Sequence, residues 1–211
     1  MKNILCFGDS NTYGYRPDGL GRYDEDTRWT ARLQKILGNE EYHIIEEGLC
    51  GRTTVFEDAL RSARKGIDAI EMLVETHSPL DIVIVMLGTN DCKTRYGASA
   101  AVIAKGVEAI IEKIRNYGDI KILVISPILL KESVGEAGFD PEFDKHSEQT
   151  SRQLAGEIKK VAQKNNCVFL DAASVAEASS TDREHLDEKG HAELAVAVAE
   201  KVTEIYGKEP I

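Results

Sequence analysis

The sequence predicts an α/β protein whose parallel β-sheet is covered by helices on both faces. Strand-like and helix-like segments alternate along the chain, which is the pattern of repeated βαβ units. The strand-like segments are short, rich in isoleucine and valine, and continuously apolar, as is typical of strands buried on both faces. The chain has 211 residues, enough for one substantial core, and no shift in composition marks a second domain. We therefore expect a single domain over residues 1–211.

Five strands and five helices are expected, in strict alternation. The strands are predicted at Asn3–Phe7, Tyr42–Glu46, Asp81–Leu87, Lys121–Ser126 and Cys167–Leu170. The helices are predicted at Arg28–Leu37, closed by Gly38, and at Ile67–His77, Ala98–Asn116, Asp144–Asn165 and Glu188–Tyr206.

The helix predicted over Ala98–Asn116 has the clearest periodicity. Val107, Ile110, Ile111 and Ile114 recur at spacings of three and four, so they form one apolar stripe along the helix. Charged residues occupy the remaining face. We expect the stripe to pack on the sheet, with no functional role.

The charge balance bears on the partners of the protein. Lys and Arg number 26 against 36 Asp and Glu, which gives a formal net charge of −10. A negative surface repels nucleic acid and anionic membranes, so neither is expected as a partner. A small neutral substrate fits this composition better.

The cysteines and the apolar segments bear on the compartment. Cys6, Cys50, Cys92 and Cys167 are widely spaced beside apolar strands, which predicts buried, reduced thiols rather than a zinc site or a disulfide framework. The apolar run before Gly8 is too short for a signal peptide, and no later run reaches the length of a membrane span. We therefore expect a cytoplasmic protein.

Polar residues follow most of the predicted strands, at the edge where an open parallel sheet binds its ligands. The first strand ends in Gly8-Asp9-Ser10, and the second leads into the glycine-containing segment 48–54. The third is followed by Gly88-Thr89-Asn90-Asp91, and the fifth by residues 181–186. These four segments are expected to converge.

The residue types in these segments suit nucleophilic catalysis. Ser10 would be the nucleophile, His185 the base that removes its proton, and Asp182 the group that orients the base. The backbone N–H groups of Ser10 and Gly51 and the amide of Asn90 are candidate donors to an oxyanion. Each residue also has an ordinary structural reading, because Ser, Gly and Asn are common in turns.

Four blocks in this order resemble the SGNH hydrolases, also called the GDSL esterase and lipase superfamily. Gly8-Asp9-Ser10 is similar to the nucleophile block, Gly51 to the glycine block, Gly88-Thr89-Asn90-Asp91 to the asparagine block, and Asp182-Arg183-Glu184-His185 to the Asp-x-x-His block. The run 46–54 and the Arg28-Trp29 pair resemble the bacterial arylesterase, acyltransferase and carbohydrate acetylesterase subgroup.

The resemblance implies a three-layer α/β/α sandwich with a flavodoxin-like five-stranded parallel sheet, the SGNH hydrolase fold. It also implies a Ser10, His185 and Asp182 triad, no metal or other cofactor, and a serine esterase that forms an acyl-enzyme on short-chain esters. Acyl transfer to an alcohol remains open. The subgroup often forms homo-oligomers, so one is expected here. The family's leucine after the serine is Asn11 in this chain, and we expect Asn11 or Asp9 to brace the turn.

The residues that contact the substrate are harder to identify from the sequence. Asn11, Trp29, Cys50 and Phe143 are the candidates, although a tryptophan is more often a packing residue. The segment 131–149, with its glycines and aromatic residues, is expected to form a lid or a subunit contact. No lysine-rich amphipathic surface helix is apparent, which favours short acyl groups over lipid interfaces.

Two other classes of function compete with the esterase. A metal-dependent phosphoesterase would use Asp9, Asp91, Asp182, His185 and His191 as ligands. His191 lies within the apolar pattern of the last predicted helix, which favours a packing role instead. A flavodoxin-like nucleotide-binding module is the other class, but the chain lacks G-x-G-x-x-G and a P-loop.

Overall fold

A computed structural model describes residues 1–207, in which five parallel strands form one sheet. The strands are β1 (Lys2–Gly8), β2 (Tyr42–Gly48), β3 (Ile82–Met86), β4 (Lys121–Ser126) and β5 (Val168–Asp171), in the order β2-β1-β3-β4-β5. The predicted α/β fold and the five predicted strands are confirmed, with ends that differ by up to two residues. The expected domain also includes residues 208–211, which lie outside the described residues.

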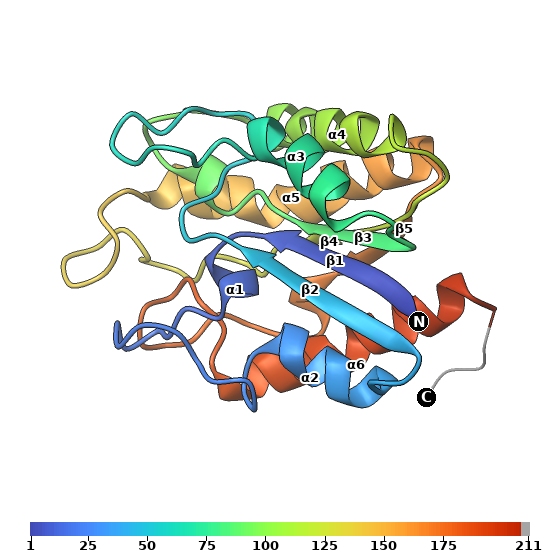
Figure 1. Ribbon diagram of the computed structural model, residues 1–211. Helices are drawn as coiled ribbons and strands as arrows, with labels where there is room; N and C mark the ends of the chain where they lie inside the picture. Colours follow the sequence, from blue (N-terminus) through green and yellow to red (C-terminus); the bar gives the residue numbers. More distant parts are fainter. Residues whose placement is uncertain (208–211) are drawn as a thin grey trace.

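Helices cover both faces of the sheet in a three-layer arrangement (Figure 1). One face carries α3 (Gly66–His77), α4 (Ala100–Arg115) and α5 (Lys145–Lys164), and the other carries α2 (Trp29–Leu37) and α6 (Glu188–Ile205). Each face has its own apolar core, so every central strand is buried on both sides. This explains why the strands are continuously apolar in the sequence.

The helix ends follow local capping chemistry. The Asp144 carboxylate accepts the Ser147 backbone N–H at 2.9 Å, and the Ser147 hydroxyl accepts the Asp144 backbone N–H at 3.1 Å, which forms a capping box at the start of α5. The Gly38 N–H donates to Gln34 O at 3.0 Å and closes α2 as predicted. The helix predicted from Ala98 begins at Ala100 instead, because Ser99 is extended and serves as its N-cap.

Three short elements were not predicted: α1 (Ser10–Tyr13) and the 3-10 helices η1 (Asn90–Cys92) and η2 (Ala172–Ser174). Ser10–Tyr13 forms a single-turn helix, α1, directly after β1, where only a turn was expected. The Asp9 carboxylate caps it by accepting the Asn11 N–H at 3.0 Å, and Gly14 ends it with a left-handed φ of 81°. Four residues are too few to produce a helical periodicity, so the sequence pattern could not reveal this turn.

The loops that follow the strands gather at one edge of the sheet (Figure 1). Because β1 and β2 run in register, Gly8 lies beside Gly48 where both strands end. The parallel arrangement brings the carboxyl ends of all five strands to this edge, as expected for a ligand site. Within residues 1–207, no helix is both long and apolar enough to cross a membrane.

Candidate active site

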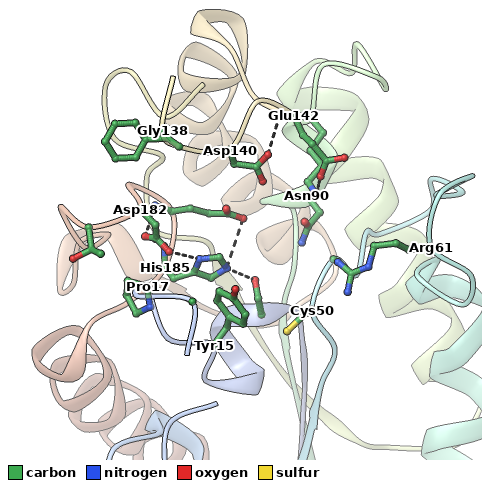
Figure 2. Close-up of a pocket in the computed structure, with 17 residues that line it drawn as sticks. Tyr15, Pro17, Cys50, Arg61, Asn90, Gly138, Asp140, Glu142, Asp182 and His185 are labelled. Carbon is green, nitrogen blue, oxygen red and sulfur yellow. Dashed lines mark hydrogen bonds and ion pairs between the residues drawn. The ribbon is translucent and has the colours of Figure 1, made fainter. Parts of the chain in front are cut away.

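A chain of two hydrogen bonds links residues from opposite ends of the sequence (Figure 2). Ser10 lies at the start of α1, and its Oγ is 2.8 Å from His185 Nε2 although the two residues are 175 positions apart. On the other side of the ring, His185 Nδ1 is 2.6 Å from Asp182 Oδ2. This is the arrangement of a nucleophile, a base and the carboxylate that fixes the base.

The loop that carries His185 is shaped by Asp182. The second carboxylate oxygen, Oδ1, accepts the backbone N–H groups of Glu184 at 3.1 Å and His185 at 3.0 Å. Arg183 has a φ of 68°, which lets the chain fold back around the carboxylate. One aspartate thus holds both the loop and the imidazole, which accounts for the spacing of three residues between Asp182 and His185.

Asn11 connects α1 to the same loop. Its Oδ1 accepts the Leu186 N–H at 2.9 Å, and its Nδ2 donates to Glu184 O at 3.5 Å. With the Asp9 cap on the Asn11 N–H, these contacts brace the serine turn as expected. They also occupy the Asn11 side chain, which is buried and does not line the cavity in which substrate binding was predicted.

His185 lies among carboxyl groups in a buried environment. Burial disfavours the charged imidazolium, but Glu184, Asp182 and Asp9 outweigh that effect, so the pKa of His185 is raised above its ordinary value. Burial in turn raises the pKa of the Asp9 and Glu184 carboxyls. A proton taken from Ser10 would therefore be stabilised on the ring.

Three groups of hydrogen-bond donors border the serine. The backbone N–H groups of Ser10 and Gly51 have no hydrogen-bond acceptor within residues 1–207. Gly51 has a φ of 83°, which an L-residue with a side chain adopts only with strain. The Asn90 amide donates one N–H to Arg52 O at 3.1 Å and has a second to offer. Ser10, Gly51 and Asn90 all line a cavity of about 470 Å³.

The GDSL-like lipase/acylhydrolase family matches residues 6–193 of this sequence. The chain belongs to this family. It is a carboxylic ester hydrolase that acts on a small-molecule ester, and the predicted superfamily is confirmed.

Solved structures of esterases are similar over nearly the whole chain. A carbohydrate acetylesterase family member from Sinorhizobium meliloti is 34% identical, with a TM-score of 0.91 over 98% of this chain and 100% of that chain. An inhibitor-bound aryl esterase of M. smegmatis is 34% identical, with a TM-score of 0.89 over 97% and 99% of the two chains. These likenesses confirm the SGNH hydrolase fold.

A curated protein matches only in part. The urease accessory protein UreG 3 of Streptomyces griseus is 30% identical over 78 residues, which are 37% of this chain and 29% of that protein. The match spans less than a third of that relative, so no function is inferred from it.

Arg52 was not predicted as a site residue, but it supports the loop that carries Gly51. The guanidinium is buried, its Nη1 donates to Gly8 O at 2.8 Å and to Glu47 O, and it lies 4.3 Å from the centre of the Phe7 ring. Burial lowers the pKa of Arg52 to about 10. Arg52 thus ties the ends of β1 and β2 to the loop that presents Gly51. No sequence signal distinguishes a buried arginine in a loop from an exposed one.

Only some of the predicted substrate-binding residues lie at the cavity. Cys50 lines the cavity, but Trp29 and Phe143 do not. Trp29 is fully buried in the core beneath α2 and α6, and Phe143 is buried in the core on the opposite face. Large rings gain more from complete burial than from a cavity wall. Phe139, which was not singled out as a contact residue, lines the cavity instead.

Two of the four cysteines are buried as predicted, and two are not. Cys6 and Cys92 are buried, whereas Cys50 and Cys167 are partly exposed because they lie at the ends of loops beside the sheet. All four are free cysteines.

The segment between β4 and α5 forms one wall of the cavity. Phe139, Asp140 and Glu142 line the space, and the Arg183 guanidinium lies 3.8 Å from the centre of the Phe139 ring. Lys93 from the asparagine loop reaches Glu142 at 2.5 Å. These contacts join the segment to the loops that carry Asn90 and His185.

Of the residues considered as metal ligands, Asp182 and His185 are in contact, but Asp91 and His191 are held elsewhere. Asp91 accepts the Thr54 N–H at 2.9 Å together with the Thr54 hydroxyl, and burial raises the pKa of Asp91 to about 6. His191 accepts the Trp29 N–H at 3.3 Å in a separate core, as its predicted packing role requires. In the described part of the chain, no group of three His, Cys, Asp or Glu side chains could hold a metal ion.

Proposed function

We propose that this esterase cleaves short-chain acyl esters, of aryl alcohols or carbohydrates, through a covalent acyl-enzyme on Ser10. The observation that carries the proposal is the hydrogen-bonded series Asp182, His185 and Ser10 at a cavity that also presents Gly51 and Asn90. The carbohydrate acetylesterase and aryl esterase that this chain resembles support the substrate class.

In the acylation step, His185 Nε2 takes the proton of the Ser10 hydroxyl as Oγ attacks the ester carbonyl carbon. Asp182 holds the imidazole in the tautomer that can accept at Nε2 and stabilises the imidazolium. His185 then gives the proton to the leaving alcohol, and the acyl group remains on Ser10.

The oxyanion formed in this step needs fixed donors. Within residues 1–207 the N–H groups of Ser10 and Gly51 make no hydrogen bond, and Asn90 has a second N–H to donate. These donors can therefore bind the oxyanion without rearranging. In the second step, water attacks the acyl carbon with His185 as the base, and the acid is released. An alcohol in place of water would yield a new ester.

The cavity favours small acyl groups. Its wall includes the charged side chains of Arg61, Lys93, Asp140 and Glu142, and a long alkyl chain placed against them would reduce their hydration at a cost in free energy. Acetyl to butyryl esters avoid this cost.

The test uses purified wild type, Ser10→Ala and Asn90→Ala with p-nitrophenyl esters of increasing acyl length. Ser10→Ala is expected to fall to background, and Asn90→Ala to lose about a hundredfold to a thousandfold in kcat. Wild-type rates are expected to fall from the acetate toward the laurate. A fluorophosphonate is expected to label the wild type but not Ser10→Ala.

Two outcomes would overturn this proposal. Hydrolysis of p-nitrophenyl acetate by Ser10→Ala at the wild-type rate would exclude the serine mechanism. Loss of wild-type activity in EDTA would favour the metal-dependent alternative instead.

We further propose that residues 1–211 form one domain, that the enzyme is a homo-oligomer, and that it works in the cytoplasm. Four free cysteines favour a reducing compartment. A monomeric mass in solution would contradict the oligomer.

A further inference from the structure

A second carboxyl group faces the cavity beside the proposed base. Glu184 lines the cavity although only 6% of the residue is exposed, and its Oε1 is 3.7 Å from His185 Nε2. This is the same nitrogen that hydrogen-bonds Ser10 Oγ. Among residues 1–207, no hydrogen-bond donor reaches the Glu184 carboxyl group.

Such a group is costly unless something binds to it. A mostly buried carboxyl group without hydrogen bonds loses much of its hydration, and the 3.7 Å contact with His185 Nε2 offsets only part of that loss. Lys93, whose charge also acts on Glu184, is already bound to Glu142 at 2.5 Å. The free oxygens of Glu184 therefore point to a ligand with hydrogen-bond donors.

The position of Glu184 relates it to one step of the proposed mechanism. The molecule that attacks the acyl-enzyme must direct an O–H toward His185 Nε2. An oxygen atom held there lies near Glu184 as well, because the carboxylate is 3.7 Å from that nitrogen. Water has a second O–H to donate to Glu184, whereas a simple alcohol has only one O–H.

We propose that Glu184 binds the acyl acceptor and selects water and vicinal diols over alcohols with a single hydroxyl. The inference rests on the acyl-enzyme of the proposed function. A diol meets the requirement because one hydroxyl attacks while its neighbour donates to Glu184. By microscopic reversibility, the leaving alcohol passes through the same place, so esters of polyols with an adjacent hydroxyl are the substrates that Glu184 favours.

The atoms balance in either case. The acceptor oxygen bonds to the acyl carbon as its proton moves to His185 Nε2, and the bond from that carbon to Ser10 Oγ then breaks. The same proton passes from His185 to Ser10 Oγ. The O–H donated to Glu184 is not transferred, and it leaves with the product.

The test measures how the acetyl-enzyme divides between acceptors. Enzyme and p-nitrophenyl acetate are mixed with 1-propanol or with 1,2-propanediol at equal concentration, and acetate and acetyl esters are quantified by chromatography. The two alcohols differ by one hydroxyl. Because both products arise from one intermediate, their ratio is independent of the acylation rate.

For the wild type, we expect the diol to be acetylated about threefold to tenfold faster than 1-propanol, the worth of one hydrogen bond. Glu184→Leu removes the carboxylate that accepts the hydrogen bond. This variant is expected to lose the preference for the diol and to transfer more acetyl to 1-propanol relative to water. Glu184→Gln keeps an amide oxygen and is expected to give an intermediate ratio. It also serves as the readout if Glu184→Leu fails to fold.

Glu177→Gln is the matched control, because Glu177 is an exposed glutamate of the same loop region that does not line the cavity. Its product ratios are expected to equal those of the wild type. Unchanged ratios in both Glu184 variants would overturn the role of Glu184. Failure of the proposed function is distinguishable, because it would appear as wild-type activity in Ser10→Ala whatever the product ratios.

Discussion

At the scale of single residues, the imidazole of His185 is surrounded by carboxyl groups. Asp182 bonds its Nδ1, Glu184 lies 3.7 Å from its Nε2, Asp9 precedes the serine, and the Tyr15 ring centre is 4.8 Å from its own. Burial lowers the pKa of His185, and the three carboxyl groups raise it by more, with Glu184 the largest of them. A change at Glu184 should therefore be visible in the pH dependence of the reaction.

The proposed base acts only when His185 is neutral, so its raised pKa places the acidic limb of kcat/KM above the pH expected for an ordinary histidine. Glu184→Gln removes a negative charge that stabilises the imidazolium. The limb is then expected to move toward lower pH, with a larger fraction of the plateau rate retained in acid. Profiles of kcat/KM for p-nitrophenyl acetate would measure this movement.

Asp140→Asn provides the comparison, since Asp140 lines the same cavity but is not among the largest influences on the pKa of His185. The acidic limb of Asp140→Asn is expected to move much less than that of Glu184→Gln. A Glu184→Gln limb that stayed in place, or moved toward higher pH, would contradict the assignment of Glu184 as the main raising charge.

The sequence predicted the position of residues whose location depends on topology, but not those that depend on packing. Ser10, Asn90 and His185 converge because each follows a strand of a parallel sheet, and that order is readable. Trp29 was a candidate for substrate contact as well as for packing, and it lies in a core, because its neighbours decide which face an aromatic side chain takes. Glu184 gave no signal, since burial of one glutamate in a polar loop has no sequence pattern.

At the scale of elements, the contact between α1 and the end of β2 sets the position of the serine. A methyl group added at Gly48 would lie 2.1 Å from the Tyr13 backbone nitrogen and 2.5 Å from the Thr12 carbonyl carbon. Backbone atoms cannot turn aside as a flexible side chain can. The glycine at this position therefore allows α1 to pack directly on the strand.

Gly48→Ala is expected to push α1 away from β2 and to lower the free energy of unfolding by about 1–3 kcal/mol, the usual cost of overpacking. It is also expected to reduce kcat, because α1 carries Ser10. Urea unfolding and p-nitrophenyl acetate hydrolysis measure the two effects.

Gly156→Ala is the matched control within α5, where an added methyl group would meet nothing within 4 Å. Alanine in a helix is expected to raise the free energy of unfolding by about 0.5–1 kcal/mol there. Equal stability changes for the two variants would contradict the close packing of α1 on β2.

The long elements were predictable and the short helices, such as α1, were not. The periodicity of α4 and the continuous apolar strands repeat over enough residues to identify them, and their observed ends differ by only one or two positions. The helix α1 depends on an aspartate cap and a left-handed glycine around four residues. An aspartate and a glycine also occur in ordinary turns, so the local sequence does not distinguish a single-turn helix from a turn.

At the scale of the whole molecule, α2 and α6 form a layer that contains a buried titratable group. His191 in α6 is fully buried, accepts the Trp29 N–H of α2 at 3.3 Å, and packs edge-on against Tyr23. Burial, helped by the charge of Arg32, lowers the pKa of His191 to about 3. The folded protein thus keeps this imidazole neutral where the unfolded chain, with an ordinary pKa of about 6.5, protonates it.

This difference fixes the sign of a pH effect on stability. As the pH falls below about 6.5, the unfolded chain gains a proton that the folded protein does not, so the free energy of unfolding decreases until about pH 3. His191→Asn retains an acceptor for the Trp29 N–H without the titration. Between about pH 8 and pH 5 the variant is expected to lose about 2 kcal/mol less stability than the wild type.

Urea unfolding between about pH 8 and pH 5 measures how the free energy of unfolding of the wild type and of His191→Asn depends on pH. Asp91, with a pKa raised to about 6, acts in the opposite direction, because its buried carboxyl is more stable when protonated and adds stability as the pH falls. That contribution is present in both proteins and cancels in the difference between them. Parallel curves for the wild type and His191→Asn would mean that the layer between α2 and α6 opens enough to hydrate the imidazole before the protein unfolds.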